Sequence, residues 1–232
     1  MVSYNEFFEN LSGLRDRIDE GLRKSGRAVG SVCLLPVTKN HPPEAVEFCH
    51  RAEIHRVGEN RVQEASGKKE SLDLDEMKWD LIGHLQSNKA GAACRTFDCI
   101  QSVDSLKLGG KINRFLEGEN RKLACLLQVN TGEDPGKFGF TEEETRESLN
   151  EWMSWEALEV EGLMTIAPLE GGRDAAVKAF ARLRCLRDEL SAASGLPLKE
   201  LSMGMSGDLE EAIREGSTMV RVGSALFGER FY

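Results

Sequence analysis

The chain has 232 residues, of which 40% are hydrophobic and 30% are charged, a composition typical of a folded globular protein. This length suits a single α/β barrel, which runs to about 250 residues, or one compact pair of domains. The formal net charge of -9 argues against a general nucleic-acid surface, because phosphate backbones are bound by clustered Lys and Arg. A bound phosphate group would therefore need a local pocket.

No targeting or membrane signal is visible. Residues 1–9 contain no basic segment followed by an apolar run, and no stretch is apolar over the roughly 20 residues that cross a bilayer. We therefore expect a cytoplasmic protein that makes no membrane contact. The six cysteines are scattered without a CxxC pair, so neither a disulfide framework nor a metal site is expected.

The first predicted element is an amphipathic helix that ends near Gly26. Its apolar residues fall at steps of three and four, which places them on one stripe: Phe7, Leu11, Leu14, Ile18 and Leu22. The next run, Val-Cys-Leu-Leu-Pro-Val-Thr-Lys over residues 32–39, is too apolar and too short for a surface helix. It predicts a strand that is buried on both faces, as in a parallel sheet.

The strand-then-helix unit recurs along the chain. Further short apolar runs occupy residues 54–57, 79–82, 99–103, 123–129, 160–166, 198–202 and 219–222. Segments with helical spacing between them include residues 44–52, 105–116, 141–152, 174–190 and 209–214. Eight strands alternating with helices is the count of a (β/α)8 barrel, whereas an open doubly wound sheet more often stops at five or six. We predict a single (β/α)8 TIM-type barrel with an extra N-terminal helix, which fills residues 1–232 as one domain and leaves no room for another.

The loops after the seventh and eighth predicted strands have the chemistry of a phosphate cradle. In barrels, sites lie at the C-terminal ends of the strands, and these two loops commonly bind phosphate through backbone N–H groups. Ser206 supplies a hydroxyl before the helix at 209–214, and Gly223 with Ser224 repeats the arrangement. The same residues serve equally well as N-caps and turn glycines, and Asp208 next to the first loop disfavours an anion.

Lys39 closes the first predicted strand. A lysine becomes a Schiff-base nucleophile only where an apolar or cationic surrounding favours its neutral amine. Most lysines are solvated surface groups, but here a buried strand and two phosphate loops share one end of the barrel. This combination predicts an aldehyde cofactor that carries a phosphate. The alternative is another phosphorylated metabolite, with Lys39 as a simple counter-charge.

Three further features stand at the same end of the barrel. Arg221 lies between apolar residues near the end of the last strand, where an inward-facing arginine needs an anion or acceptor from the ligand, or an ion pair with a Glu. His84 follows the third strand and either takes an acid–base role or is an ordinary loop residue. The segment 130–140, rich in Gly and charge, either covers the pocket or only connects a strand to a helix.

Six motifs in order resemble one known family, the pyridoxal phosphate homeostasis proteins, which look like the barrel domain of alanine racemase standing alone. The resemblance spans nearly the whole chain. It rests on Pro-Val-Thr-Lys at 36–39, Gly-Glu-Asn-Arg-Val-Gln-Glu at 58–64, Ile-Gly-His-Leu-Gln-Ser-Asn-Lys at 82–89, Gly-Leu-Met-Thr at 162–165, Leu-Ser-Met-Gly-Met-Ser at 201–206, and Met-Val-Arg-Val-Gly-Ser at 219–224 followed by Phe227 and Gly228.

The resemblance implies a cofactor and a role for each site residue. Pyridoxal 5'-phosphate (PLP) would form a Schiff base with Lys39, with Asn60 and Met205 near it. Arg221 would lie beside the pyridine ring, where an arginine keeps the ring nitrogen unprotonated and favours carrying over catalysing. The residues implied to hold the phosphate are Ser206, Gly223 and Ser224. Two departures from the family, Asn40-His41-Pro42 after the lysine and Ser in place of Thr at 224, put only the affinity in doubt.

The predicted function is to carry or buffer PLP in intracellular vitamin B6 and amino-acid homeostasis, with PLP-dependent enzymes as acceptors and no nucleic acid, membrane or metal partner. The alternative is a PLP-dependent amino-acid racemase or a related enzyme. Racemisation needs a base on each face of the substrate, and in alanine racemase the second base is a tyrosine brought by an extra domain and a partner subunit. This chain has only two tyrosines, Tyr4 and Tyr232. We therefore expect any catalysis to be weak and of the racemase type.

Overall fold

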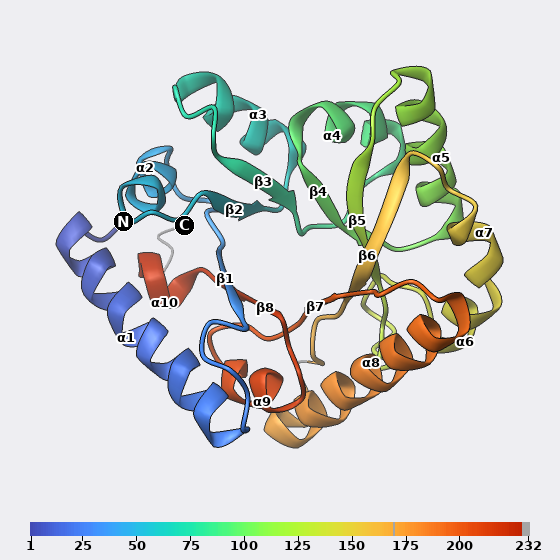
Figure 1. Cartoon of the computed structure of the whole chain (residues 1–232). Helices are drawn as coiled ribbons and strands as arrows, with labels where there is room; N and C mark the ends of the chain where they lie inside the picture. The colour runs from blue at the N-terminus through green and yellow to red at the C-terminus, as the bar shows by residue number, and fades with distance from the viewer. Residues whose placement is uncertain (169, 229–232) are drawn as a thin grey trace.

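Eight parallel strands stand at the centre of the structure, and helices pack around them (Figure 1). The computed structural model describes residues 1–168 and 170–228, so Tyr232 lies outside the described residues. The strands are β1 (Cys33–Pro36), β2 (Arg56–Glu59), β3 (Lys78–Leu81), β4 (Cys99–Val103), β5 (Leu123–Gln128), β6 (Leu158–Met164), β7 (Glu200–Ser202) and β8 (Met219–Val222). The helices are α1 (Tyr4–Lys24), α2 (Glu44–Arg51), α3 (Val62–Ser71), η1 (Ser87–Lys89), α4 (Ala90–Thr96), α5 (Leu106–Gly118), α6 (Glu142–Glu147), α7 (Leu149–Met153), α8 (Gly172–Ser194), α9 (Leu209–Arg214) and α10 (Ser224–Phe227).

The strand order makes the sheet a barrel. Each strand pairs in parallel with its neighbour in the order β1-β8-β7-β6-β5-β4-β3-β2. The remaining gap between β1 and β2 is closed by a parallel bridge between Val37 and Gly58, and the Thr38 N–H donates to the Gly58 carbonyl at 3.1 Å. The predicted (β/α)8 barrel is confirmed.

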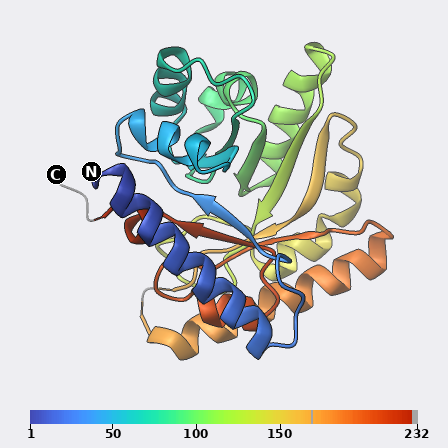
Figure 2. The ribbon, with the colours of Figure 1, turned by 60° about the vertical axis from the view of Figure 1, so that its left-hand side comes forward.

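Helix α1 lies across the outside of the barrel (Figure 2). It begins after Ser3, whose hydroxyl accepts from the Glu6 N–H while the Glu6 carboxylate accepts from the Ser3 N–H, a capping box that satisfies two of the open N–H groups at the helix start. All five residues of the predicted apolar stripe are buried, and the helix packs against α9 and α10. The predicted extra N-terminal helix is confirmed.

Three local expectations were wrong. Cys33 is exposed and Leu34 is half-buried, so β1 is not buried on both faces along its length, because its first residues lie at the barrel end opposite the C-terminal ends of the strands. Strand β2 begins and ends two residues later than predicted, which makes Glu59 its last residue rather than part of the loop beyond. The segment 141–152 forms two helices, because Ser148 leaves the helical conformation at φ -85° and ψ 4°.

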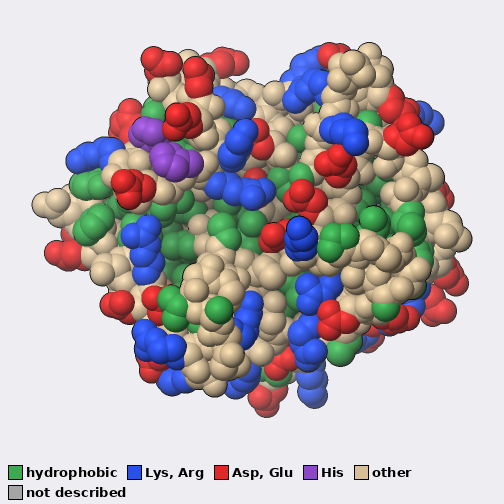
Figure 3. Space-filling view, viewed as in Figure 1, with side chains coloured by type: hydrophobic (Ala, Val, Ile, Leu, Met, Phe, Trp, Pro, Cys, Tyr) green, Lys and Arg blue, Asp and Glu red, His purple; other side chains and the backbone are tan. Residues whose placement is uncertain are grey.

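No helix within residues 1–168 and 170–228 is both long and apolar enough to span a bilayer. On the face drawn in Figure 3, Lys and Arg side chains lie among Asp and Glu side chains rather than in one basic area. This mixed pattern is not the footprint that a nucleic-acid backbone would need on that face.

Candidate functional site

A cavity of about 420 Å³ opens at the C-terminal ends of the strands. This volume lies within the range of small-molecule sites, roughly 300–1,000 Å³. The residues that sequence reasoning selected all line this one cavity, although they come from β8 and from the segments that follow β1, β2, β7 and β8: Lys39, Asn60, Met205, Ser206, Arg221, Gly223 and Ser224. The structure therefore brings the predicted site residues together, and their roles toward a cofactor stay predictions.

A buried charge cluster lies behind Lys39. It consists of Lys68 on α3 with Glu59 and Glu64, and we call it the Lys68 cluster. The Lys68 Nζ is 2.6 Å from Glu59 Oε1 and 2.8 Å from Glu64 Oε1, and the side chains of Lys68 and Glu59 are 5% and 0% exposed. Burial raises the pKa of the Glu59 carboxyl, while the ammonium of Lys68 acts in the opposite direction.

The Lys68 cluster holds the backbone on both sides of Lys39. On one side, the Lys68 Nζ donates to the Thr38 carbonyl at 2.7 Å and the Thr38 hydroxyl donates to Glu59 at 2.6 Å. On the other side, the Asn40 N–H donates to the Glu64 carboxylate at 2.5 Å. Asn40 has φ 60°, the left-handed region that Asn adopts more readily than most residues. Lys39 is thus fixed between two tethered peptide groups at the cavity wall.

Gly83 allows Asn60 to reach the cavity. A Cβ atom at position 83 would lie 2.4 Å from the Asn60 carbonyl oxygen and 2.8 Å from its Cα. Such contacts are too short for any side chain, so only glycine lets the loops after β2 and β3 touch at this point.

Arg221 lies on the inner side of the cavity and is only 4% exposed. Its Nη1 donates to the Ser202 hydroxyl at 2.7 Å and its Nη2 donates to the Thr165 carbonyl at 2.8 Å. Burial lowers the pKa of Arg221 to about 10, which still leaves the guanidinium charged at neutral pH. Its described hydrogen bonds go to neutral acceptors, and no Glu within residues 1–168 and 170–228 forms the ion pair expected as the alternative.

The loops after β7 and β8 bring two hydroxyls together. Ser206 Oγ and Ser224 Oγ are 3.5 Å apart, and Gly207 beside them has open space where a Cβ would stand. Asp208 does not line the cavity, because its carboxylate accepts from the Met205 N–H at 2.6 Å. Two hydroxyls and a glycine-rich backbone at one end, with a lysine amine at the wall, fit a ligand that has both a phosphate and an aldehyde.

His84 stands at the mouth of the cavity. Its Nδ1 is 2.8 Å from the Asp104 carboxylate, and its ring stacks on Phe138 with centroids 3.6 Å apart and an interplanar angle of 11°. Phe138 belongs to the segment 130–140, which also lines the cavity with Gly136 and Lys137. The segment therefore borders the pocket and is more than a connection between a strand and a helix.

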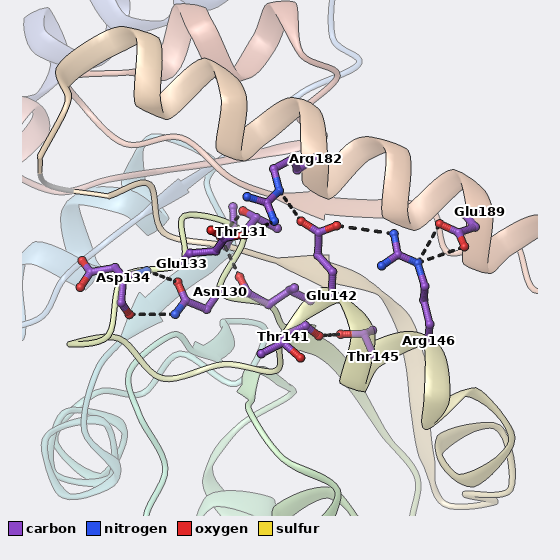
Figure 4. A network of polar contacts seen from close by, with 12 residues as sticks. Asn130, Thr131, Glu133, Asp134, Thr141, Glu142, Thr145, Arg146, Arg182 and Glu189 are labelled. Atoms are coloured by element: carbon purple, nitrogen blue, oxygen red, sulfur yellow. Dashed lines mark hydrogen bonds and ion pairs between the residues drawn. The ribbon is translucent and has the colours of Figure 1, made fainter.

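An ion-pair network anchors the start of this segment (Figure 4). Arg182 on α8 pairs with Glu133 at 2.6 Å and also with Glu142 on α6. Arg146 pairs with Glu142 at 3.5 Å and with Glu189 on α8 at 3.0 Å. Because most of these side chains are substantially exposed, salt will weaken the network.

Comparison with known proteins places the chain in a family. Residues 14–231 match the family model described as alanine racemase, N-terminal domain. The pyridoxal phosphate homeostasis protein of Aquifex aeolicus is 38% identical over 97% of this chain and 98% of its own length, and that of Pseudomonas aeruginosa is 39% identical over 97% and 96%. This chain belongs to the pyridoxal phosphate homeostasis protein family. The resemblance inferred from the six sequence motifs is confirmed.

A solved structure of this family extends the likeness to three dimensions. PipY of Synechococcus elongatus PCC7942, solved with PLP bound, is 39% identical, and its match covers 91% of this chain and 100% of that chain with a TM-score of 0.82. The same protein without PLP gives a TM-score of 0.86. The barrel described above is thus also the fold of PipY.

Sequence reasoning missed the residues that support the site from behind. The spacing of Glu64 and Lys68 by four residues on a helix was a visible signal for an ion pair, but not for its burial beside Lys39. Gln101, a polar residue within the apolar run of β4, is a second signal of a buried polar contact, because its amide oxygen accepts from Ser202, which in turn accepts from Arg221. Gly83 gave no signal beyond its residue type.

Proposed function

We propose that this protein binds PLP as a Schiff base with Lys39 in the cytoplasm, and that it carries or buffers the cofactor in vitamin B6 and amino-acid homeostasis. PLP-dependent enzymes would be the acceptors of the cofactor. All six cysteines are free thiols, which suits a reducing intracellular compartment. Membership of a family whose relatives carry the name pyridoxal phosphate homeostasis protein supports the role.

The observation that carries the proposal is the shared cavity. Lys39, the hydroxyl-bearing Ser206 and Ser224, and the buried Arg221 all line it. An aldehyde with a phosphate needs an amine and a phosphate cradle within one small pocket. PipY, which was solved with PLP bound, shares 39% of its residues with this chain.

Five of the residues that line the cavity would hold PLP. Lys39 would hold the aldehyde end of PLP through its side-chain amine. Ser206, Gly223 and Ser224 would hold its phosphate through hydrogen bonds. Arg221 would lie beside the ring, where its positive charge would disfavour protonation of the pyridine nitrogen. Bound PLP supplies a reactive aldehyde and an electron-accepting ring, and an unprotonated ring nitrogen weakens the second property, which suits a carrier.

The test is the site of covalent attachment. The purified protein should be yellow after incubation with PLP, and borohydride reduction followed by peptide mass spectrometry should find the adduct on Lys39. Lys39→Ala should stay colourless. Lys137→Ala, which removes the other lysine that lines the cavity, is the matched control and should remain yellow with the adduct still on Lys39. An adduct on Lys137, or none at all, would refute the proposal.

A racemase is the second candidate, and the pair of His84 and Asp104 favours it. A carboxylate that accepts from Nδ1 of a histidine leaves Nε2 as a proton acceptor, the arrangement of a general base. The discriminating measurement is exchange of the α-hydrogen of alanine in deuterated water with the PLP-loaded protein. Exchange at about 1 s⁻¹ or faster, the range of ordinary enzymes, would establish an enzyme, and His84→Ala should then abolish it. Slow exchange that His84→Ala does not alter supports the carrier.

A further inference from the structure

Polar side chains cross the interior of the barrel, where apolar packing would be expected. Asp80 on β3, Gln101 on β4 and Ser202 on β7 are each 0% exposed, and Arg221 on β8 is 4% exposed. They come from strands on different sides of the barrel. Burial of four polar groups is unfavourable unless each finds a hydrogen-bond partner, so the contacts between them decide whether the arrangement is stable.

These side chains form one continuous hydrogen-bonded chain. The Arg221 Nη1 donates to Ser202 Oγ at 2.7 Å, and Ser202 Oγ donates to Gln101 Oε1 at 2.6 Å. The Gln101 amide then donates to one oxygen of the Asp80 carboxylate, and the second oxygen accepts from Arg56 Nε at 2.8 Å. Arg56, whose side chain is 37% exposed, opens β2. The chain thus runs from the end of the barrel opposite the cavity to a residue that lines the cavity.

The chemistry of Arg221 and Asp80 fixes the direction of each hydrogen bond between them. An arginine can only donate and an ionised carboxylate can only accept. Because Asp80 accepts, the amide nitrogen of Gln101 must face it and the amide oxygen must face Ser202. The Ser202 hydroxyl must therefore donate to Gln101 and accept from Arg221. The three links from Arg221 to Asp80 therefore point the same way, and bonds that are aligned in this manner strengthen one another.

We propose that Gln101 and Ser202 are positioning residues that hold the Arg221 guanidinium toward the cofactor ring, with the Asp80–Arg56 pair as their anchor. This inference rests on the proposed function, in which Arg221 lies beside the PLP ring. The two described bonds of Arg221 use two of its five N–H donors, so the orientation set by Ser202 and Thr165 leaves donors for the cavity. Gln101 acts through Ser202 and does not itself line the cavity.

The experiment removes one hydrogen-bonding side chain at a time, first the one next to Arg221 and then the one beyond it. Ser202→Ala removes the acceptor that Arg221 uses, and Gln101→Leu removes the acceptor that orients Ser202. Val103→Ala is the matched control, because Val103 is also a buried β4 residue at 0% exposure and its truncation costs packing without removing a polar group. The dissociation constant for PLP and the pH dependence of the visible spectrum are measured for all variants.

Ser202→Ala and Gln101→Leu should each raise the dissociation constant by about tenfold, the effect of one hydrogen bond to a charged group. The visible spectrum of the bound cofactor changes with pH, and these variants should also shift the midpoint of that change by about one pH unit. Val103→Ala should lose thermal stability with a dissociation constant within about twofold of the wild type. A Gln101→Leu protein with wild-type affinity and an unchanged pH midpoint overturns the inference.

A second measurement keeps this inference separate from the proposed function. In the protein without PLP, nitrogen-15 NMR follows the exchange of the Arg221 guanidinium protons with solvent. Exchange should be slow in the wild type and in Val103→Ala, and faster in Gln101→Leu. If the wild type fails to bind PLP, the proposed function fails while this comparison still decides whether Gln101 holds Arg221. Equal exchange in Gln101→Leu and the wild type would refute the positioning role.

Discussion

Lys68→Met tests whether the charge cluster behind Lys39 is a structural requirement of the site. Methionine resembles lysine in length and in helix propensity, so the substitution in α3 removes mainly the ammonium group. What remains is Glu59, with a side chain that is 0% exposed, and Glu64, with a side chain that is 22% exposed. Two carboxylates then face each other at a buried position without a cation between them.

The expected loss of stability follows from this geometry. Removing one partner of a buried ion pair costs about 3–5 kcal/mol, because the other charge stays buried and uncompensated. In a chain of this length each kcal/mol lowers the melting temperature by about 2–4 °C, which gives a fall of roughly 6–20 °C. Loss of the hydrogen bond to the Thr38 carbonyl should also loosen Lys39 and weaken PLP binding.

The pH dependence of this loss has a definite sign. Burial already raises the pKa of Glu59, and removal of Lys68 raises it further. A carboxyl whose pKa is higher in the folded state than in the unfolded state binds a proton more readily when the protein is folded. The free energy of unfolding therefore rises as the pH falls through the interval between the folded-state and unfolded-state pKa values. The deficit of Lys68→Met should therefore shrink between pH 8 and pH 5. Adding Glu59→Gln should recover stability and flatten the pH dependence.

Urea unfolding measured by tryptophan fluorescence provides the assay. The control is Lys69→Met on the same helix, because Lys69 is exposed and makes one hydrogen bond to the Thr96 carbonyl at 3.0 Å; it should change stability by less than about 1 kcal/mol. If Lys68→Met unfolds within about 1 kcal/mol of the wild type at pH 8, the cluster contributes no net stability and the reasoning fails.

Two further predictions concern glycines and thiols. Gly83→Ala should destabilise the protein and lower its affinity for PLP in titrations, because the new Cβ would lie 2.4 Å from the Asn60 carbonyl oxygen. The control is Gly67→Ala in the exposed part of α3, where a new Cβ would have nothing within 4 Å. This control should stabilise the protein by about 0.5–1 kcal/mol. Burial raises the pKa of Cys94 to about 11, so a thiol reagent at pH 8 should label the two exposed cysteines of the folded protein and reach the other four only in denaturant; rapid labelling of four or more would contradict the described burial. The buried cysteines are Cys49, Cys94, Cys99 and Cys125.

The barrel could be predicted because its signals are local. Each buried strand is a short apolar run, and α1 shows its apolar stripe in the spacing of its residues. The ends of the elements were less predictable, because they depend on contacts with distant residues. Strand β2 extends to Glu59 because this glutamate finds a buried partner in Lys68, which sequence alone would place on a solvated helix face.

The candidate site likewise has residues that could be predicted from the sequence and residues that could not. Lys39, Ser206 and Arg221 could be selected because polar residues that follow buried strands must gather at one end of a barrel. Gln101 and Ser202 lie 101 positions apart in the chain and meet only inside the barrel. Their contact depends on barrel closure, and one sequence contains no direct record of it.

The Lys68 cluster and the buried hydrogen bonds from Asp80 to Arg221 each act on one residue of the candidate site. The Lys68 cluster fixes the peptide groups on either side of Lys39, and the interior chain from Asp80 fixes the guanidinium of Arg221. Well-packed apolar residues would often stabilise a barrel as well as buried charges do, so stability alone does not account for them. The Lys68 cluster ends at Lys39 and the interior hydrogen bonds end at Arg221. These are the two basic residues that sequence reasoning selected for the cofactor. Exposed side chains, Phe138 and Met205, line the same cavity as these two cations, and that combination suits the carrier role proposed above.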